Sequence, residues 1–406
     1  MKQLPNKLHI VAFDIPYPSD YGGVIDIYHK IQALSSLGIS ITLHMFQYGR
    51  ETADKELGKY CTQLHYYKRS VYKNPFLGSK PYIVNSRNSE LLLENLCLDN
   101  APILFEGLHC TYFLNHKSLK KRFKVVRTHN IEHHYYKQLE KSELRYFKKY
   151  FFRIEAEKLR KYESVLKHAN LLAAISPNDA TYLAKKYDNV VYIPAFHSTN
   201  KMENPGIRGE YLLYHGNLSV PENYLAAMQL INEVFSKIDK PCIVAGNNPP
   251  KELVKLCEQY PNISLKSHVT TDEIHELIKD AHINVLFTNQ NTGIKLKLLN
   301  ALFRGKFAIV NNLMVEGSGL EKVCIVASDF KEIISKIEEY FLLEYSKAYF
   351  DNRKTYLFEN FGNINGAKKL ADLIEFDNSP AATRKQDKTM LQGLSQLSSI
   401  LSYFSL

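Results

Sequence analysis

Residues 8–46 read LHIVAFDIPYPSDYGGVIDIYHKIQALSSLGISITLHMF. The short apolar run Leu8–Phe13 is typical of a buried strand, and Val24–Leu37 repeats apolar side chains at helical spacing before a stop at Gly38. Ile39–Phe46 follows as a second predicted strand. A strand, a glycine-bearing loop, a helix and a strand form a βαβ unit, which predicts a parallel sheet.

The same alternation continues along the chain. In the first half, further strands are predicted at 102–105, 124–127, 171–175 and 190–193, with helices over 137–169 and from Ser176. In the second half, strands are predicted at 211–214, 241–245, 263–265, 283–287, 307–310 and 325–326, again with helices between them. Two consecutive α/β halves, each with its own sheet, are therefore expected.

Composition shifts suggest where these halves end. The segment 197–209 is rich in Ser, Asn, Pro and Gly, which indicates a linker between domains over 1–196 and 210–350. The segment 351–376 contains a final predicted helix, and the tail 377–406 is expected to be loose. Residues 391–406 are uncharged and place apolar side chains on one helical face, so a partner-binding or membrane-surface helix remains an alternative to a docked or loose tail.

The overall composition excludes several classes of protein. The chain has 406 residues, of which 45% are hydrophobic and 23% charged, as in ordinary globular domains. Its six cysteines contain no C-x-x-C pair, which disfavours zinc-finger and thioredoxin-type sites. No apolar run approaches the roughly 20 residues of a membrane span, and no signal peptide is recognisable. A cytoplasmic protein is expected.

Positive charge is concentrated in the first half. The formal net charge is +10, and residues 116–161 alone hold 15 basic residues against five acidic ones. Such a segment attracts phosphates, nucleic acid or an anionic membrane, although a solvated helix face has the same composition. The chain shows no recognised nucleic-acid-binding module, so nucleic acid is not an expected partner.

Two glycine-bearing loops follow predicted strands, where parallel sheets bind ligands. Gly22 and Gly23 open the first helix, and Gly216 and Asn217 follow the strand 211–214. Glycine lets a ligand approach the backbone closely, and the N–H groups at a helix start hold anions. Ordinary tight turns are the alternative, and the dinucleotide fingerprint G-x-G-x-x-G is absent.

A second group of candidates is polar and follows two further strands. These residues are Glu106, His109, His129, Asn130 and Glu132. The histidine spacing lacks the H-E-x-x-H order of a metalloprotease, so a metal site is disfavoured. Hydrogen bonding to sugar hydroxyls or to phosphate fits these side chains better.

The most specific signal lies at the start of the helix predicted over 295–303. Thr292 and Gly293 would place free backbone N–H groups there, and Lys295 and Lys297 follow in the first turns. A cation at the positive end of a helix costs typically about 0.3–1 kcal/mol. Both lysines make sense if a diphosphate balances their charge. The alternative is a surface lysine pair that tolerates the dipole.

Taken in order, these motifs resemble those of the GT-B glycosyltransferases, most closely the retaining glycosyltransferase family 4. The segments that carry the resemblance are Gly22-Gly23, Val126–Glu132, Ala173–Asp179, Tyr214–Leu218, Gly293–Gly305 and Val315–Gly317. The resemblance implies two Rossmann-like domains facing across a cleft. The C-terminal domain would hold a nucleotide-sugar donor and the N-terminal domain an acceptor, and the final helix would cross back to the first domain.

The resemblance also implies roles for single residues. Lys295 and Lys297 match basic residues that bind the donor diphosphate, Glu316-Gly317 matches a loop near the donor, and His129 matches a histidine near the transferred sugar. No cofactor and no catalytic metal are implied, because the nucleotide sugar is a co-substrate and basic side chains replace the metal.

There is one departure from the family pattern. The family often shows two glutamates separated by seven residues, whereas this chain has Thr292 and Asn300 at those positions. An amide still bonds hydroxyl groups but does not act as a carboxylate.

The expected function is transfer of a hexose-type sugar, with retention, from a nucleotide-diphosphate sugar to a glycan or a lipid-linked saccharide in cell-surface polysaccharide or glycoconjugate synthesis. If transfer inverts the sugar, a base is needed, and His109, His129 and Glu132 are the candidates. The stretch 116–161 is expected to bring the protein to the inner membrane face. The alternatives are a non-catalytic or divergent GT-B protein that binds a nucleotide sugar or a partner, and a GT-B epimerase.

Overall fold

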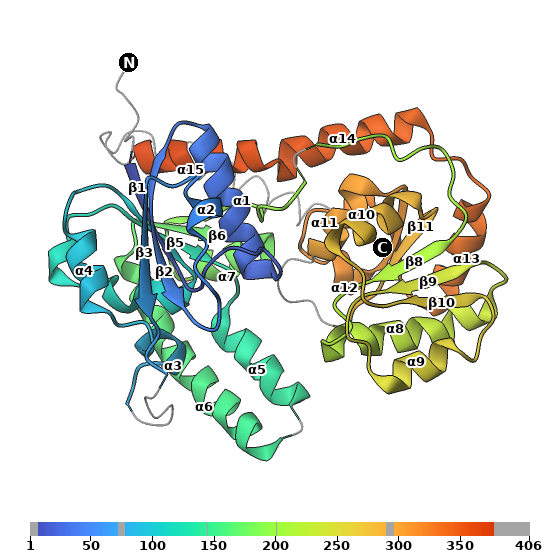
Figure 1. Cartoon of the computed structure of the whole chain (residues 1–406), viewed down its shortest axis with the longest axis horizontal. Helices are drawn as coiled ribbons and strands as arrows, with labels where there is room; N and C mark the ends of the chain where they lie inside the picture. The colour runs from blue at the N-terminus through green and yellow to red at the C-terminus, as the bar shows by residue number, and fades with distance from the viewer. Residues whose placement is uncertain (1–6, 72–77, 144, 200, 290–295, 377–406) are drawn as a thin grey trace, which may run out of the picture.

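The computed structural model describes residues 7–71, 78–143, 145–199, 201–289 and 296–376. They form two α/β domains that lie side by side, one coloured blue to green and one yellow to orange in Figure 1. Among these residues, no helix is both long enough and apolar enough to cross a membrane.

The N-terminal domain is built on seven parallel strands in the order β3-β2-β1-β4-β5-β6-β7. Their bounds are β1 Lys7–Ala12, β2 Ser40–Gln47, β3 Gln63–Lys68, β4 Ile103–Glu106, β5 Lys124–Thr128, β6 Leu171–Ala174 and β7 Val190–Tyr192. The strands β1, β4, β5 and β6 are buried almost throughout, which explains why β1, β4 and β6 are mostly apolar, whereas β5 buries Lys124, Arg127 and Thr128 as well. The strand order reverses between β1 and β4, and such a switch point opens a crevice at the carboxyl ends of the strands.

The C-terminal domain repeats this plan with six parallel strands in the order β10-β9-β8-β11-β12-β13. Their bounds are β8 Leu212–His215, β9 Cys242–Ala245, β10 Ile263–Lys266, β11 Ile283–Leu286, β12 Phe307–Asn311 and β13 Ile325–Ala327. Here the strand order reverses between β8 and β11. The predicted fold class, two parallel α/β sheets, is confirmed.

Helices cover both sheets. In the N-terminal half they are α1 Gly22–Ser36, α2 Asp54–Leu57, α3 Tyr82–Asn85, α4 Glu90–Leu96, α5 Glu132–Ser142, α6 Tyr146–Tyr162 and α7 Pro177–Ala184. In the C-terminal half they are α8 Pro221–Glu233, α9 Lys251–Cys257, α10 Thr271–Asp280, α11 Leu296–Arg304, α12 Asn312–Val315, α13 Phe330–Phe341, α14 Lys347–Phe361 and α15 Asn363–Phe376. Side chains cap two of these helices: the Ser176 hydroxyl accepts from the Asp179 N–H at 3.0 Å, and Thr270 forms a capping box with Glu273.

Two of the predicted helices are each divided. The stretch 137–169 contains parts of α5 and α6, which pack on each other as a hairpin because rings such as Tyr136 and Phe152 meet at 5.9 Å. The final helix is two helices, α14 and α15, separated at Gly362, whose backbone is extended. The strand β3 and the helices α2, α3 and α4 have no counterpart in the sequence-based assignment.

Each domain has its own hydrophobic core. The N-terminal core gathers residues from Leu8 to Phe196 together with Ala367–Ile374 of α15, and the C-terminal core runs from Met202 to Phe361. Figure 1 shows α14 running from the C-terminal domain across to α15, which packs beside α1. The chain therefore passes between the domains near residues 197–201 and again near Gly362.

Candidate functional site

The two domains enclose a cavity of about 250 Å³. Its N-terminal wall comes from the β5–α5 connection and α7, and its C-terminal wall from α11 and the loop after α12. Among the residues that line it are Ile131, Asn178, Asp179, Leu298, Glu316 and Gly317. Two of the residues proposed from the sequence for the donor, Glu316 and Gly317, therefore lie at the interface between the domains.

Gly317 allows the domains to meet closely at this cavity. Its φ of +63° is in the left-handed region, and a Cβ atom there would overlap the side chain of Asn178. The Asn178 Nδ2 donates to the carbonyl oxygen of Glu316 at 3.4 Å. The loop after α12 thus touches α7 of the opposite domain through backbone groups that a larger residue would hold apart.

On the donor side, the end of β8 and the start of α11 bring two predicted residues, Gly216 and Lys297, close to the same side chain, Asn223. Lys297 Nζ donates to Asn223 Oδ1 at 3.0 Å and lies 5.3 Å from the centre of the Tyr214 ring. Asn223 also packs against Gly216, where an added Cβ would be 3.2 Å from the amide carbon. Burial, and then the charges of Lys297 and His275, lowers the pKa of His215 to about 3, so this imidazole is neutral beside the lysine. The carboxyl end of β8 therefore presents one cation next to a neutral, buried ring.

The other donor candidates are less closely grouped. Asn217 is exposed and accepts from the Ser219 N–H at 3.1 Å, as in a turn. Asn300 lies half-buried on α11, three positions after Lys297. Thr292, Gly293 and Lys295 lie outside the described residues.

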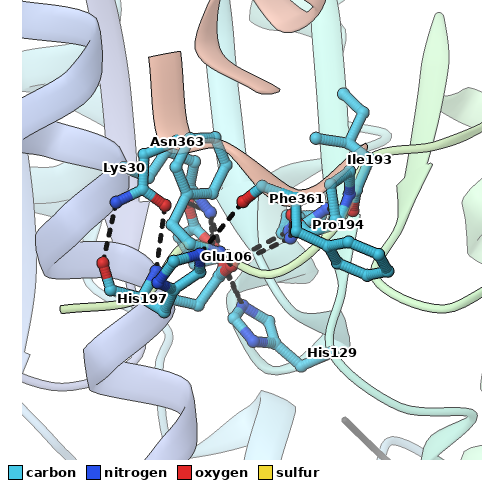
Figure 2. A network of polar contacts seen from close by, with 11 residues as sticks. Lys30, Glu106, His129, Ile193, Pro194, His197, Phe361 and Asn363 are labelled. Atoms are coloured by element: carbon cyan, nitrogen blue, oxygen red, sulfur yellow. Dashed lines mark hydrogen bonds and ion pairs between the residues drawn. The ribbon is translucent and has the colours of Figure 1, made fainter. Parts of the chain in front are cut away.

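A fully buried ionic network lies behind the acceptor side (Figure 2). Asp26 Oδ2 accepts from Lys30 Nζ at 2.7 Å, and Asp26 Oδ1 accepts from Arg127 Nη2 at 2.8 Å. Lys30 Nζ also lies 2.9 Å from Glu106 Oε1, and Glu106 Oε2 is 2.9 Å from His129 Nε2. Figure 2 shows Glu106 between Lys30 and His129. His129 and Glu106 are thus brought together as predicted, but both are committed to this network and neither lines the cavity.

The charges in this network balance one another. Burial alone would raise the pKa of Asp26, but Arg127 and Lys30 outweigh it and hold the pKa below its ordinary value. Burial likewise opposes ionisation of Glu106, whose pKa is nevertheless lowered by Lys30 and His129. Asp26, Glu106 and His129 offer ligand-type atoms within 4.8 Å of one another, as a metal would require. The two cations already provide the positive charge that a metal ion would supply.

The same network reaches the segments that connect the domains. Arg127 donates to the carbonyl oxygens of Ile193 and Pro194 at 2.6 and 2.9 Å. Asn363 Nδ2 donates to the His197 carbonyl at 2.7 Å, and the His197 N–H donates to Asn363 Oδ1 at 3.1 Å. Figure 2 shows His197 close to Asn363, and Ile193 close to Pro194. The segment that leaves the N-terminal domain at residues 193–197 is therefore bonded to β5 through Arg127. It is also bonded, through His197, to the segment that returns at Asn363.

The remaining acceptor-side residues surround Phe13. The His109 ring lies 5.2 Å from the Phe13 ring, and His109 Nδ1 is 3.8 Å from Glu132 Oε1. Gly23 packs against the same phenylalanine, and Gly22 faces Leu296 of the other domain, where a Cβ would be 3.7 Å from Cδ1. Burial lowers the pKa of His109 well below its ordinary value, so the ring is neutral.

Glu132 is a buried acid at the start of α5, only 3% exposed. Burial and, after it, Asp179 raise the pKa of Glu132 to about 8, while the Asn130 side chain bonds it and opposes the rise. Burial also raises the pKa of Asp179 to about 6, and Asp179 lines the cavity. At neutral pH Glu132 therefore keeps its proton, and its carboxyl O–H is available as a hydrogen-bond donor.

Glu132→Gln is expected to flatten the dependence of stability on pH. Between the ordinary pKa of 4.5 and about 8, the folded protein holds a proton on Glu132 that the unfolded chain has lost, so stability falls as pH rises through this window. The variant should lack up to about 1.4 kcal/mol per pH unit of that slope and be more stable than the wild type near pH 8. Urea unfolding at a series of pH values measures this. The exposed Glu359→Gln serves as control, and identical slopes for all three proteins would contradict the expectation.

Asp26 and Lys30, whose opposite charges pair inside the buried network, are not identified in the sequence analysis. Asp26 and Lys30 are four positions apart on the first predicted helix, and this i, i+4 pair of opposite charges inside an apolar pattern was the available signal. His133 lies four residues after His129, yet its Nδ1 is 3.1 Å from Glu163 and not near Glu106. Histidines close together in the sequence therefore belong to separate networks.

Comparison with known proteins identifies the fold. Residues 209–341 match the family described as glycosyl transferases, group 1. A glycosyltransferase from Rickettsia africae superposes with a TM-score of 0.63 at 15% identity, over 91% of this chain and 98% of that one. The chain therefore has the GT-B fold, and over residues 209–341 it is similar to the group 1 glycosyl transferases. The predicted resemblance is confirmed at this level.

Two further proteins extend the comparison. HepE from Anabaena, in a complex with UDP and glucose, gives a TM-score of 0.61 at 10% identity, over 92% of this chain and 100% of that one. An uncharacterized 44.6 kDa protein in the cps region of Klebsiella pneumoniae is 28% identical over 346 residues, which cover 80% of this chain and 88% of that protein.

Proposed function

We propose that this GT-B protein transfers a hexose-type sugar from a nucleotide-diphosphate donor to a glycan or a lipid-linked saccharide. The observation that carries the proposal is the position of Lys297. It stands in the first turn of α11, at the switch point of the second sheet, and the next residue, Leu298, lines the cavity between the domains. A cation at the positive end of a helix is what a diphosphate requires.

In the proposed reaction, charge builds on the leaving diphosphate while the sugar passes through an oxocarbenium-like state. Lys297 would stabilise that charge, which is worth more in a closed cleft than in water. Lys295 and the Gly293 N–H, proposed from the sequence, would share this role. Retention needs no protein nucleophile, and no cofactor or metal is part of the proposal.

The acceptor would occupy the opposite wall. Neutral His109 and protonated Glu132 offer one hydrogen-bond acceptor and one donor for sugar hydroxyls. His129, whose ring Glu106 holds at 2.9 Å, would help to position the transferred sugar. If transfer inverts the sugar, His109 is the better base, because Glu132 is already protonated at neutral pH.

Two findings guide the choice of substrates to test. HepE was seen with UDP and glucose, which makes UDP-glucose the first donor to try. The Klebsiella relative lies in a cps region, which supports cell-surface polysaccharide synthesis as the setting. A second candidate function is binding of a nucleotide sugar without turnover, and it is favoured by Thr292 and Asn300 in place of the two family glutamates.

The experiment is a panel of UDP-, GDP-, dTDP- and CMP-sugars tested by thermal shift, followed by a turnover assay with the donor that binds. One nucleotide class should raise the melting temperature of the wild type and of Lys331→Ala, an exposed control on α13, but not of Lys297→Ala. Binding without release of nucleotide in the presence of saccharide acceptors would favour the non-catalytic function. No stabilisation by any donor would contradict the proposed donor site.

We also propose that the basic segment 116–161 brings the protein to an anionic inner membrane face from the cytoplasm. The structure narrows which charges are available for this contact. Arg122, Lys124 and Arg127 are at most 5% exposed. The segment's exposed charge lies largely in the α5–α6 hairpin, as well as in the turns around Lys117–Lys121.

A further inference from the structure

The hairpin of α5 and α6 projects from the N-terminal domain (Figure 1). The 17 residues of α6 span about 25 Å. Near its base and middle, Phe152 meets Tyr136 at 5.9 Å between ring centres, and Phe151 meets Tyr82 at 6.3 Å. These ring contacts fix the base and middle of the hairpin to the domain.

The far end has an unusual sequence. Residues 145–153 read RYFKKYFFR, with four basic residues, five aromatic residues and no acidic residue. Phe151 and Phe152 are half-buried, whereas Tyr146, Phe147 and Tyr150 are 78%, 84% and 50% exposed. Phe147 is the most exposed of the large hydrophobic side chains in the described part of the chain. We call residues 145–150 and Arg153 the hairpin tip.

Basic side chains dominate the hairpin tip, and the nearby Glu143 carboxylate, at the end of α5, accepts from the Arg145 backbone N–H at 2.9 Å. Arg145, Lys148, Lys149 and Arg153 are all exposed, and within the described residues none of them forms an ion pair with a carboxylate. Further along the hairpin, by contrast, Lys137 and Arg160 both lie near Glu157, at 3.9 and 3.0 Å. The positive charge and the exposed rings therefore coincide at the same end.

We propose that the hairpin tip docks on an anionic lipid bilayer, with its rings at the level of the headgroups and its basic side chains on lipid phosphates. Amphipathic rings favour the membrane interface, and each Lys or Arg near an anionic surface contributes about a fivefold gain in binding. A nucleic-acid site would instead track the backbone along a groove, whereas this surface is the end of a projection. The proposal deepens the membrane part of the proposed function and rests on it.

Docking at the tip also suits the position of the cavity. Ile131, immediately before α5, lines the cavity, so the cavity lies at the base of the hairpin. The 11 residues of α5 span about 16 Å. A tip that touches the headgroups would hold the cavity about one helix length from the surface, within reach of a saccharide carried on a lipid.

The chain contains no tryptophan, which permits a direct test. Phe147→Trp places a single indole at the hairpin tip, and Leu342→Trp places one at a 73% exposed position in the C-terminal domain. Full-length proteins are mixed with vesicles of phosphatidylcholine containing phosphatidylglycerol, or of phosphatidylcholine alone. Only Phe147→Trp with the anionic vesicles is expected to show a blue shift of emission, and added salt should reverse it.

A second measurement separates charge from the aromatic probe. Lys148→Gln combined with Lys149→Gln should weaken co-sedimentation with the anionic vesicles about thirtyfold, whereas Lys331→Gln combined with Lys354→Gln should leave it unchanged. Equal shifts at both reporter positions, or binding that ignores the tip charges, would overturn the proposal. A blue shift of Phe147→Trp that depends on protein concentration without vesicles would assign the tip to a second copy of the chain instead. Turnover of soluble substrates is measured separately, so failure of docking and failure of transfer are distinguishable.

Discussion

Asp26→Ala is expected to lower the free energy of unfolding of the N-terminal domain by about 3–5 kcal/mol. The substitution leaves Lys30 and Arg127 buried with one carboxylate fewer, and it removes the acceptor of the Phe196 N–H, which is 2.8 Å from Asp26 Oδ1. Because the folded pKa of Asp26 is depressed, its contribution is present above the ordinary value of 3.8 and is lost as pH falls below it.

Denaturant unfolding at neutral pH, followed separately for the two domains, measures this effect. Glu157→Ala is the matched control, because it removes an exposed carboxylate that pairs with Arg160 at 3.0 Å. Exposed pairs of this kind contribute about 0–1 kcal/mol. An Asp26→Ala protein no less stable than this control would show that the buried network does not hold the domain together.

Lys297→Met is expected to lower kcat/KM of the proposed transfer by a factor on the order of 10²–10³. The variant keeps most of the apolar stem that packs on Tyr214 and removes the charge that would face the leaving diphosphate. Its fold should be retained, since the side chain is only half-buried.

The measurement compares initial rates for the wild type, Lys297→Met and the exposed control Lys331→Met, with melting temperatures recorded in parallel. A loss of activity together with normal melting locates the effect in the reaction. Activity of Lys297→Met within a few fold of the control would rule out its proposed role at the diphosphate.

Most of the fold could be predicted because the spacing of apolar residues along the chain indicates where strands and helices lie. Buried parallel strands are continuous apolar runs, as in β1 and β4. The strand β3 was missed because it is an edge strand whose sequence, QLHYYK, is half polar and only partly buried. The helical periodicity predicts one helix where the structure has the α5–α6 hairpin. The two arms of the hairpin pack through rings such as Tyr136 and Phe152, and periodicity does not encode contacts of this kind.

The candidate site was predictable only in part. Glycines and polar residues after strands mark the right edge of each sheet, and Gly216 directly after β8 illustrates this. The partners of the buried charges could not be predicted in this way. Asp26 and Arg127 are 101 residues apart in sequence, and their contact depends on the strand order. Packing likewise decides which carboxylate each histidine contacts, as for His129 with Glu106 and His133 with Glu163.

The paired connections between the domains have a mechanical consequence. The Asn363 side chain forms two hydrogen bonds with the His197 backbone, which joins the two connections between the domains. We expect the joined connections to act as one hinge. We expect the domains to move relative to each other mainly by rotation about these connections. Such a rotation would break the Asn178–Glu316 hydrogen bond, which joins the two domains at the cavity and is long at 3.4 Å. Substrate entry and product exit would thus follow one repeated path instead of many.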